Sequence, residues 1–353
     1  MQFVVVGINH KTAPIEIREK FYCAPAQQEL LLSEFKSHPA VIDALVLSTC
    51  NRTEIYSHVL HSANTRDLLA FLFEIKGIKT TEKFRKHFYS YGGQEAMSHF
   101  FKVTSGLDSL ILGEKQILGQ VKEAVELSRK KAMLGKQFNI LSNLAIRTGK
   151  KAQNETDISF GGCSISWAAV MMAEKMLGNL KEKSVLVIGA GKMGEMAVTQ
   201  MQKKGVKHIY IMNRTESCAL ELAKRLNGEA VSFGDIKEIL AKIDVCICSV
   251  GAPHYILDKS TVEKVMATRD RKRIIFIDIS MPRNIDPDIA SVGNTLLFHI
   301  DDLDRVVGDS MKKRQAAIDE VEKIILEKIT SFNNKIKKIK DLESTNQVDL
   351  ANA

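Results

Sequence analysis

Short apolar runs and helix-like spacing alternate over the first part of the chain. The runs at residues 3–8, 44–47 and 55–60 predict strands, and the spacing at residues 27–35 predicts a helix between the first two. From residue 68 to about 154 the spacing is mostly helical, with few strong strand-like runs. We therefore expect a small N-terminal α/β unit followed by a helical subdomain.

A different pattern follows the sequence SFGGCS at residues 159–164, where two adjacent glycines interrupt the helical spacing. A helix is predicted at residues 165–177. Four short, almost continuous apolar runs then occur at residues 185–188, 209–212, 245–250 and 274–279, separated by helical patterns, as is typical of buried parallel strands. The pattern predicts a doubly wound parallel sheet, a Rossmann-type fold, with a linker and hinge near residues 160–163.

The last part of the chain predicts one long amphipathic helix. No proline occurs after about Asp301, and apolar residues recur at steps near three, four or seven, namely at Ile318, Val321, Ile325, Phe332, Ile336 and Ile339. Their stripe could pack on the same chain or on a second subunit. We expect domains at residues 1–160, 161–300 and 301–341, with a flexible, frayed tail at 342–353.

Composition narrows the class of protein. The 353 residues are 45% hydrophobic and 26% charged, which is ordinary for a globular protein of two or more domains. The six cysteines lack any C-x-x-C spacing, so neither a disulfide scaffold, a zinc module nor another metal site is expected, and a reducing compartment is indicated. The first apolar run is far shorter than the ~18 residues of a spanning helix, so we expect a cytoplasmic protein with no membrane association. A net charge of +8 modestly favours a polyanionic partner but leaves tRNA, DNA or none open.

Residues 189–194, GAGKMG, directly follow an apolar run and open a helical pattern. In this context G-x-G-x-x-G is typical of a dinucleotide site, because its glycines allow the tight turn, the approach of a pyrophosphate and close helix packing. The helix N-terminus would present free N–H groups to phosphate. A glycine turn in an unrelated α/β protein is the alternative.

The end of the next predicted strand favours NADP over NAD. NAD enzymes usually place an acidic residue here, whereas this chain has Asn213-Arg214-Thr215, and a guanidinium suits a 2′-phosphate. Alternatively, Arg214 is a solvated loop cation. The predicted cofactor-binding residues are Gly189, Ala190, Gly191, Lys192, Met193, Gly194, Asn213, Arg214 and Thr215.

A candidate nucleophile, Cys50, lies where a predicted strand ends, within the segment LSTCNRTE at residues 47–54. Arg52 could bind a carboxylate through two hydrogen bonds and lower the pKa of the thiol, while Thr49 and Asn51 add hydrogen-bonding groups. An inert cysteine that fills the core is the alternative.

Four separated motifs together resemble the glutamyl-tRNA reductase family. They are GINHKTAP at 7–14, STCNRTEIY at 48–56, SGLDSLILGEKQILGQVK at 105–122 and GAGKMG. The resemblance implies NADPH-dependent reduction of glutamyl-tRNA to glutamate-1-semialdehyde with release of tRNA, the first committed step toward 5-aminolevulinate and tetrapyrroles. It also implies that Cys50 attacks the ester to form a thioester, which then accepts hydride. Residues 1–160 would be the catalytic, glutamyl-tRNA-binding domain.

The same resemblance implies further roles. His99 would be a general acid or base near the thiol. Gln116 and Gln120 are four residues apart and would share a helix face, although capping and solvation explain that spacing equally well. Lys115 stands where the family commonly has proline. The predicted substrate-binding residues are Thr49, Asn51, Arg52, Ser109, Glu114, Lys115, Gln116 and Gln120.

The resemblance also suggests a homodimer through the C-terminal helix, although that region is shorter than is usual in the family, and handover of product to the downstream aminomutase. Lysines at 335, 337, 338 and 340 form a basic helix end that could approach phosphate or be merely solvated. Two other functions stay open. One is a shikimate-type NADP-dependent dehydrogenase, and the other is a catalytically silent relative that binds tRNA.

Overall fold

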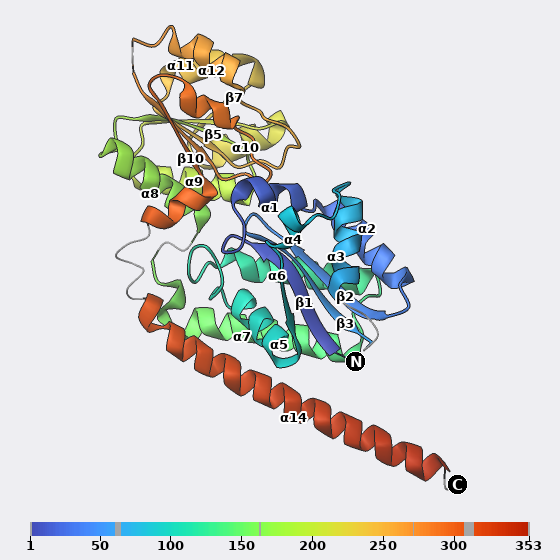
Figure 1. Ribbon diagram of the computed structural model, residues 1–353. Coiled ribbons are helices and arrows are strands. Elements are labelled where there is room, and N and C mark those ends of the chain that lie inside the picture. Colours follow the sequence, from blue (N-terminus) through green and yellow to red (C-terminus); the bar gives the residue numbers. More distant parts are fainter. Residues whose placement is uncertain (1, 61–64, 162–163, 271, 307–313, 352–353) are drawn as a thin grey trace. The chain divides into compact units, whose positions relative to one another are not determined.

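The computed structural model describes residues 2–60, 65–161, 164–270, 272–306 and 314–351. The chain forms two compact units, which are described separately below. Unit 1 comprises residues 1–161 and 309–353, and unit 2 comprises residues 162–308 (Figure 1). The predicted α/β class is confirmed, with an antiparallel sheet in unit 1, a parallel sheet in unit 2 and a long C-terminal helix.

Unit 1 is built on a four-stranded antiparallel sheet in the order β2-β3-β1-β4. Its strands are β1 (Gln2–Asn9), β2 (Val41–Ser48), β3 (Arg52–Val59) and β4 (Tyr89–Gly92). The first three coincide with the predicted strands. The sequence did not predict β4, because its four residues, YSYG, are short and contain no apolar run.

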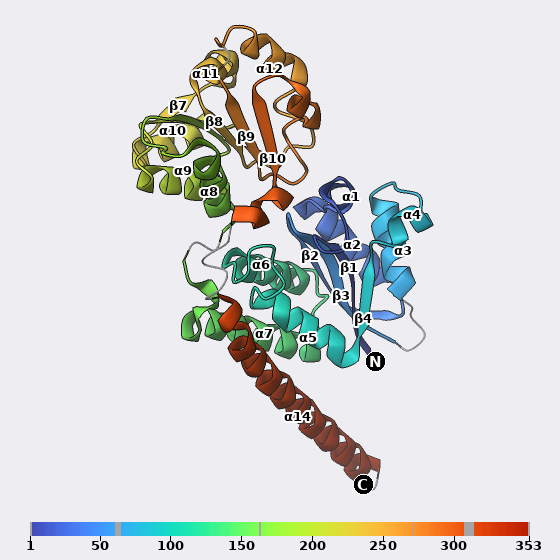
Figure 2. The same cartoon turned by 60° about the vertical axis from the view of Figure 1, so that its left-hand side comes forward.

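Helices cover both faces of this sheet (Figure 2). Because side chains of a strand alternate between faces, Phe3 and Val5 of β1 pack on one side, and Val4 and Val6 pack on the other. The first side meets α5 (Gly93–Thr104), α6 (Gln116–Lys130) and α7 (Lys136–Glu155), and the second meets α1 (Ile15–Phe21), α2 (Pro25–Ser37) and α3 (Thr65–Ile75). A short helix, α4 (Glu82–Arg85), precedes β4.

The long helix α14 (Ile318–Ala351) belongs to unit 1 and packs on α5 and α7. Its residues Val321, Ile325, Ile329 and Phe332 are buried in the same cluster as Phe138 of α7, so this part of the apolar stripe packs on its own chain. The predicted start near residue 301 is wrong, because residues Ile300–Val306 form a 3₁₀ helix, η4. The helix continues to Ala351, and residues 344–351 contain no glycine or proline that would end it, while the flexibility of the tail stays a prediction.

Unit 2 has a six-stranded parallel sheet in the order β10-β9-β8-β5-β6-β7, which is the Rossmann order. The four predicted strands are present as β5 (Ser184–Ile188), β6 (His208–Met212), β8 (Val245–Cys248) and β9 (Ile274–Asp278). The sequence did not predict the two edge strands, β7 (Glu229–Val231) and β10 (Thr295–His299), because they contain only two and three consecutive apolar residues and are mostly half-buried.

The predicted helix α8 (Ile165–Leu177) leads into β5. The connections between the strands contain α9 (Lys192–Lys203), α10 (Glu216–Arg225), α11 (Ile236–Lys242) and α12 (Lys259–Met266). Short 3₁₀ helices occur at η1 (Asp157–Ser159), η2 (Phe233–Asp235) and η3 (Pro287–Ser291). Residues 162–163 of the predicted hinge lie outside the described residues, so the hinge stays a prediction. No helix in the described parts of the chain is both long and apolar enough to cross a bilayer.

Gly7 on β1 lies opposite Glu54 on β3, and the fit is close. A Cβ atom at Gly7 would lie 2.7 Å from Glu54 Cγ and 2.9 Å from the Thr53 carbonyl oxygen. We predict that Gly7→Ala lowers the free energy of unfolding by roughly 1–3 kcal/mol, because backbone atoms must move to make room. Urea denaturation followed by circular dichroism would measure the change.

Gly119 in α6 provides the matched control, because an added Cβ there meets no atom within 4 Å. We expect Gly119→Ala to leave the protein as stable as before, or to stabilise it by about 0.5–1 kcal/mol through its higher helix propensity. Equal effects of the two substitutions would show that crowding opposite Glu54 is unimportant.

Candidate active site

Cys50 lies in the tight turn that joins β2 to β3, where the side chain is half-buried. The Thr49 amide donates to the Arg52 carbonyl oxygen at 2.7 Å, and the Asn51 amide donates to Thr49 Oγ1 at 3.2 Å. From the end of β1, the His10 amide donates to the Asn51 carbonyl oxygen at 3.0 Å. These bonds hold the predicted residues Thr49, Asn51 and Arg52 around the thiol.

The electrostatics of Cys50 differ from the sequence-based expectation. Burial, and next the nearby Glu114 carboxylate, raise the pKa of the thiol to about 12, while Arg18 and Arg52 lower the pKa to a smaller extent. The predicted direction of the Arg52 effect is therefore right, but this effect does not dominate. At neutral pH the thiol of the free protein is protonated.

Arg52 is 2% exposed and contacts two carboxylates. Its Nη1 lies 2.7 Å from Glu54 Oε1 and 2.9 Å from Asp108 Oδ2, and its Nη2 donates to the Asp108 carbonyl oxygen. Burial alone would lower the pKa of the guanidinium, but Glu54 outweighs burial and the pKa is raised. The guanidinium is thus a fixed cation, and both of its Nη atoms already donate hydrogen bonds within the protein.

His99 projects from α5 onto Glu54, not onto the thiol. Its Nε2 lies 2.8 Å from Glu54 Oε1, and its ring lies among Tyr56, Tyr89 and Tyr91 with centroid distances of 6.3, 5.4 and 5.2 Å. Within the described residues, no hydrogen bond joins His99 to Cys50. The role of His99 as an acid or base near the thiol stays a prediction.

Glu54 is the acceptor that joins these groups, and it is 0% exposed. The hydroxyls of Tyr56 and Tyr89 also donate to its carboxylate. Burial would raise the pKa of Glu54, but Arg52 and then His99 counteract it and hold the pKa far below its usual range. We call Arg52, Glu54, Asp108, Tyr56, Tyr89 and His99 the Glu54 network.

The loop between α5 and α6 adds Asp108, Ser109 and Glu114 to this side of unit 1. Asp108 forms an ion pair with Lys11, and Ser109 is half-buried. Glu114 is 5% exposed, and within the described residues its carboxylate has no hydrogen-bond partner. Burial raises the pKa of Glu114 to about 7, although Arg52 opposes the shift.

Three further predicted residues lie at the start of α6. Lys115 is exposed and immediately precedes the helix, where its side chain makes no capping hydrogen bond. Gln116 is the first helical residue, and Gln120 lies one turn later, so both half-buried amides share a helix face as predicted. Their contact with a substrate stays a prediction.

The glycine loop of unit 2 lies between β5 and α9, as predicted. Gly189 has φ +112°, and a Cβ atom at Gly194 would lie 1.8 Å from the Gly189 carbonyl oxygen, so α9 can begin this close only with glycine there. A cavity of about 580 Å³ lies beside the loop, lined in part by Gly189, Gly191 and Ser249. Helix α9 begins at Lys192, so its first amides adjoin the loop.

Residues at the end of β6 complete this cavity. Asn213 Oδ1 accepts from the Ala190 amide at 3.2 Å, which ties the end of β6 to the glycine loop. Arg214 and Thr215 line the cavity, and Arg214 is exposed without an ion-pair partner among the described residues. The cavity, the glycine cradle and the free guanidinium fit a dinucleotide.

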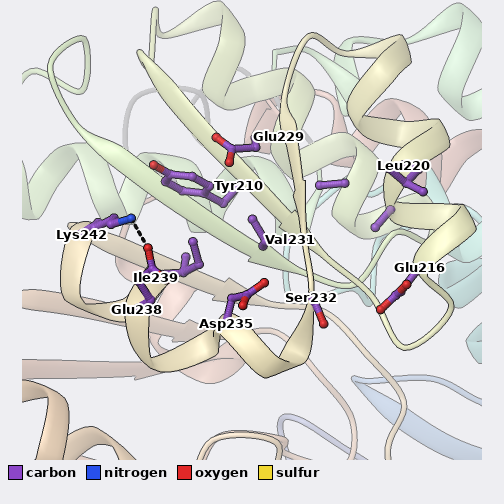
Figure 3. A pocket seen from close by; sticks show the side chains of 12 residues that line it. Tyr210, Glu216, Leu220, Glu229, Val231, Ser232, Asp235, Glu238, Ile239 and Lys242 are labelled. Carbon is purple, nitrogen blue, oxygen red and sulfur yellow. Dashed lines mark hydrogen bonds and ion pairs between the residues drawn. The ribbon is translucent and has the colours of Figure 1, made fainter.

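A second cavity on unit 2, of about 530 Å³, lies over β6 and β7 (Figure 3). Its lining includes Glu216, Glu229, Asp235 and Glu238, and Lys242 pairs with Glu238 at 2.5 Å. This acidic lining would repel a pyrophosphate. The glycine-loop cavity is therefore the better dinucleotide site.

The sequence reasoning missed the groups that surround Arg52 and His99. It assigned no role to Glu54, Tyr56, Tyr89, Asp108 and His10. Glu54 and Tyr56 lie within the motif STCNRTEIY at residues 48–56. Because they alternate with Arg52 along one predicted strand, the sequence indicated that all three side chains share a face of the sheet. Asp108 likewise stands within the motif at residues 105–122, whereas no local pattern marked Tyr89.

A Rossmann-type sheet with a glycine loop, in the same chain as a half-buried cysteine held in a polar turn, defines the class of nucleotide-dependent oxidoreductases with a candidate cysteine nucleophile. The family model "Glutamyl-tRNAGlu reductase, N-terminal domain" matches residues 6–156. The model "Shikimate / quinate 5-dehydrogenase" matches residues 171–306, which lie within unit 2.

Similar proteins identify the family. The chain is 41% identical over 344 residues to a glutamyl-tRNA reductase of Thermodesulfovibrio yellowstonii, covering 94% of this chain and 79% of that protein. It is 38% identical over 333 residues to that of Aquifex aeolicus, covering 94% and 81%. The solved structure of glutamyl-tRNA reductase from Methanopyrus kandleri matches with a TM-score of 0.53 and 34% identity, covering 97% of this chain and 82% of that chain. The chain belongs to the glutamyl-tRNA reductase family.

The buried Glu114 carboxyl makes stability depend on pH. Its folded pKa of about 7 lies above the ordinary value of 4.5, so between these values the folded state keeps a proton that the unfolded state loses. Ionisation of Glu114 therefore destabilises the fold as pH rises through this window. We predict that Glu114→Gln gains about 2–3 kcal/mol of unfolding free energy relative to the unsubstituted protein between pH 4 and pH 8.

Denaturation curves across that pH range would measure the difference. Glu95→Gln, at an exposed position on α5, is the control and should show no comparable trend. A Glu114→Gln difference that stays constant from pH 4 to pH 8 would contradict the prediction.

Proposed function

We propose that this protein reduces the glutamyl group of glutamyl-tRNA to glutamate-1-semialdehyde with NADPH, through a thioester on Cys50. The observation that carries the proposal is the placement of Cys50, half-buried in a tight turn beside the fixed Arg52 cation, in a chain similar along most of its length to glutamyl-tRNA reductases. This reaction would be the first committed step toward 5-aminolevulinate and tetrapyrroles.

In the first step, the Cys50 sulfur bonds to the ester carbonyl carbon, and the bond from that carbon to the tRNA oxygen breaks. The thiol proton leaves the sulfur, and the departing tRNA hydroxyl gains a proton. Because burial and Glu114 raise the pKa of the free thiol to about 12, the thiol enters this step protonated and loses its proton before or during the attack. Arg52 and Arg18 favour the thiolate electrostatically.

His99 is the proposed acid or base for the departing hydroxyl. Its contact with Glu54 fixes the orientation of the ring. The proposed substrate contacts are those of Thr49, Asn51, Arg52, Ser109, Glu114, Lys115, Gln116 and Gln120. Among them, the unpaired Glu114 carboxylate suits the ammonium group of a glutamyl substrate.

The glycine-loop cavity is the proposed NADPH site, with the amides at the start of α9 facing the pyrophosphate and Arg214 facing the 2′-phosphate. When bound, NADPH supplies the hydride that converts the thioester carbonyl to the aldehyde and releases the Cys50 sulfur. No acidic side chain takes the position after β6 that an NAD enzyme would use for the ribose.

Two partner predictions belong to the same proposal. A homodimer through α14 would need surface other than the stripe at Val321, Ile325, Ile329 and Phe332, because these residues are buried within unit 1. Handover of the reactive aldehyde to the downstream aminomutase is proposed from the family resemblance alone.

The thioester can be trapped. With NADPH withheld, we predict that Cys50 acquires the glutamyl group from labelled glutamyl-tRNA, and that Cys50→Ser abolishes both this labelling and aldehyde formation. Intact-protein and peptide mass spectrometry would locate the added mass. Cys218→Ser, at an exposed cysteine in unit 2, should keep full activity.

Other outcomes would decide between the alternatives. Aldehyde formed at a normal rate by Cys50→Ser excludes the thioester. Oxidation of NADPH by free small ketoacids, with no use of glutamyl-tRNA, would indicate a shikimate-type dehydrogenase, the class whose family model matches unit 2. Tight tRNA binding without turnover would indicate a silent relative.

Cofactor preference should depend on Arg214. We predict that Arg214→Gln raises the KM for NADPH roughly 10- to 100-fold, because a charge-assisted hydrogen bond of about 1.5–3 kcal/mol is lost, and leaves the KM for NADH nearly unchanged. Steady-state kinetics with both cofactors would measure this, with the exposed Lys224→Gln on α10 as control. Parallel losses with NADPH and NADH would contradict a contact to the 2′-phosphate.

A further inference from the structure

A groove of about 430 Å³ lies between α7 and α14 of unit 1, far along the chain from the Cys50 turn. The two helices lie side by side in both views (Figures 1 and 2). The lining consists of Ile140, Asn143, Leu144, Arg147, Ser331, Phe332 and Lys335. No acidic residue contributes to this described lining.

The charged groups of the groove are exposed cations. Arg147 comes from α7 and Lys335 from α14, and Lys338 lines an adjoining hollow one helical turn beyond Lys335. None of the three forms an ion pair within the described residues. This distinguishes them from Lys102 of α5, which pairs with Glu322 of α14 at 2.7 Å, and from Lys151 of α7, which pairs with Glu155 at 3.6 Å.

The neutral groups of the groove also favour an anion. Ser331 and Asn334 are exposed, and neither side chain has a hydrogen-bond partner among the described residues. Hydroxyl and amide donors placed among unpaired cations are typical of surfaces that bind phosphate oxygens. Glu327 lines the adjoining hollow one turn before Ser331, and Asp341 follows Lys338 by three positions along α14.

An apolar partner fits the groove less well. The apolar stripe of α14 is already covered, since Ile329 and Phe332 are 3% and 7% exposed within the core of unit 1. What remains at the surface is a cationic rim over a narrow apolar floor. Such a rim would repel the same face of a second copy.

We propose that this groove, which contains Arg147, Ser331 and Lys335, together with Lys338 of the adjoining hollow, binds the phosphate backbone of the tRNA body, away from the aminoacylated end. The inference rests on the proposed function, because it adds a second contact to the same substrate. Backbone contacts of this kind carry little sequence information, but they increase affinity and position the substrate. Binding of the tRNA body at this groove would help to position the aminoacylated end on unit 1. Cys50 takes no part in this contact.

The test is a triple variant, Arg147→Gln with Lys335→Gln and Lys338→Gln, in the full chain. With glutamyl-tRNA, we expect the KM to rise roughly 10-fold or more at 0.15 M KCl, and the slope of log KM against log[KCl] to fall by about two to three, since each lost phosphate contact removes about 0.7–0.9. With a glutamyl thioester of a small thiol, which carries no nucleic acid, the rate should be unchanged.

Lys224→Gln with Lys237→Gln and Lys264→Gln is the matched control. It removes three exposed cations of unit 2 that form no ion pair among the residues the structure describes, and it changes the net charge equally. An equal rise in KM for both triple variants, or an unchanged salt slope for the groove variant, would overturn the proposal. Loss of the small-substrate rate together with a changed sedimentation coefficient would instead assign the groove to a subunit interface.

The proposed function and this inference fail separately. If the unsubstituted protein does not reduce glutamyl-tRNA, the proposed function fails before any variant is made. If the unsubstituted protein reduces glutamyl-tRNA and the groove variant does so with the same KM and salt slope, only the groove proposal fails.

Discussion

The buried Glu54 carboxylate constrains the rest of unit 1, because an ionised group at 0% exposure persists only when charge and hydrogen bonds replace water. Arg52 supplies the charge, and Tyr56, Tyr89 and His99 supply hydrogen bonds. These donors come from β3, β4 and α5, and Asp108 of the following loop holds the other side of Arg52. Three elements and a loop must therefore meet at one point for Arg52 to stand beside the Cys50 turn.

The register of the antiparallel sheet makes this meeting possible. Arg52, Glu54 and Tyr56 alternate along β3, so all three side chains fall on one face, and a slip of one residue would replace them with Thr53 and Ile55. Pairing of Asn9 with Arg52 sets that register. The same pairing of β1 with β3 therefore buries the apolar side chains of β1 in the core and places the charged groups of β3 beside the turn at Cys50.

The sequence predicted correctly the features that depend on residues close together in the chain. It did not predict features that depend on residues far apart in the chain. The central strands of unit 2 are nearly continuous apolar runs, whereas β7 and β10 contain only two and three consecutive apolar residues and are mostly half-buried. Cys50 and the glycine loop were found because each is marked locally. The net pKa of the thiol was not predictable from Arg52 alone, because burial and Glu114, 64 positions away in the chain, outweigh the guanidinium.

This balance of charges couples the state of the thiol to occupation of the site. Near neutral pH the Glu114 carboxyl titrates, and its negative charge is the second largest reason that the pKa of Cys50 is raised. A cation bound at Glu114 cancels that charge, and the thiolate then becomes easier to form. In the proposed function the cation is the ammonium group of the glutamyl substrate, so the substrate itself removes an obstacle to attack. The free protein meanwhile keeps its thiol protonated, and a protonated thiol reacts slowly with oxidants and electrophiles.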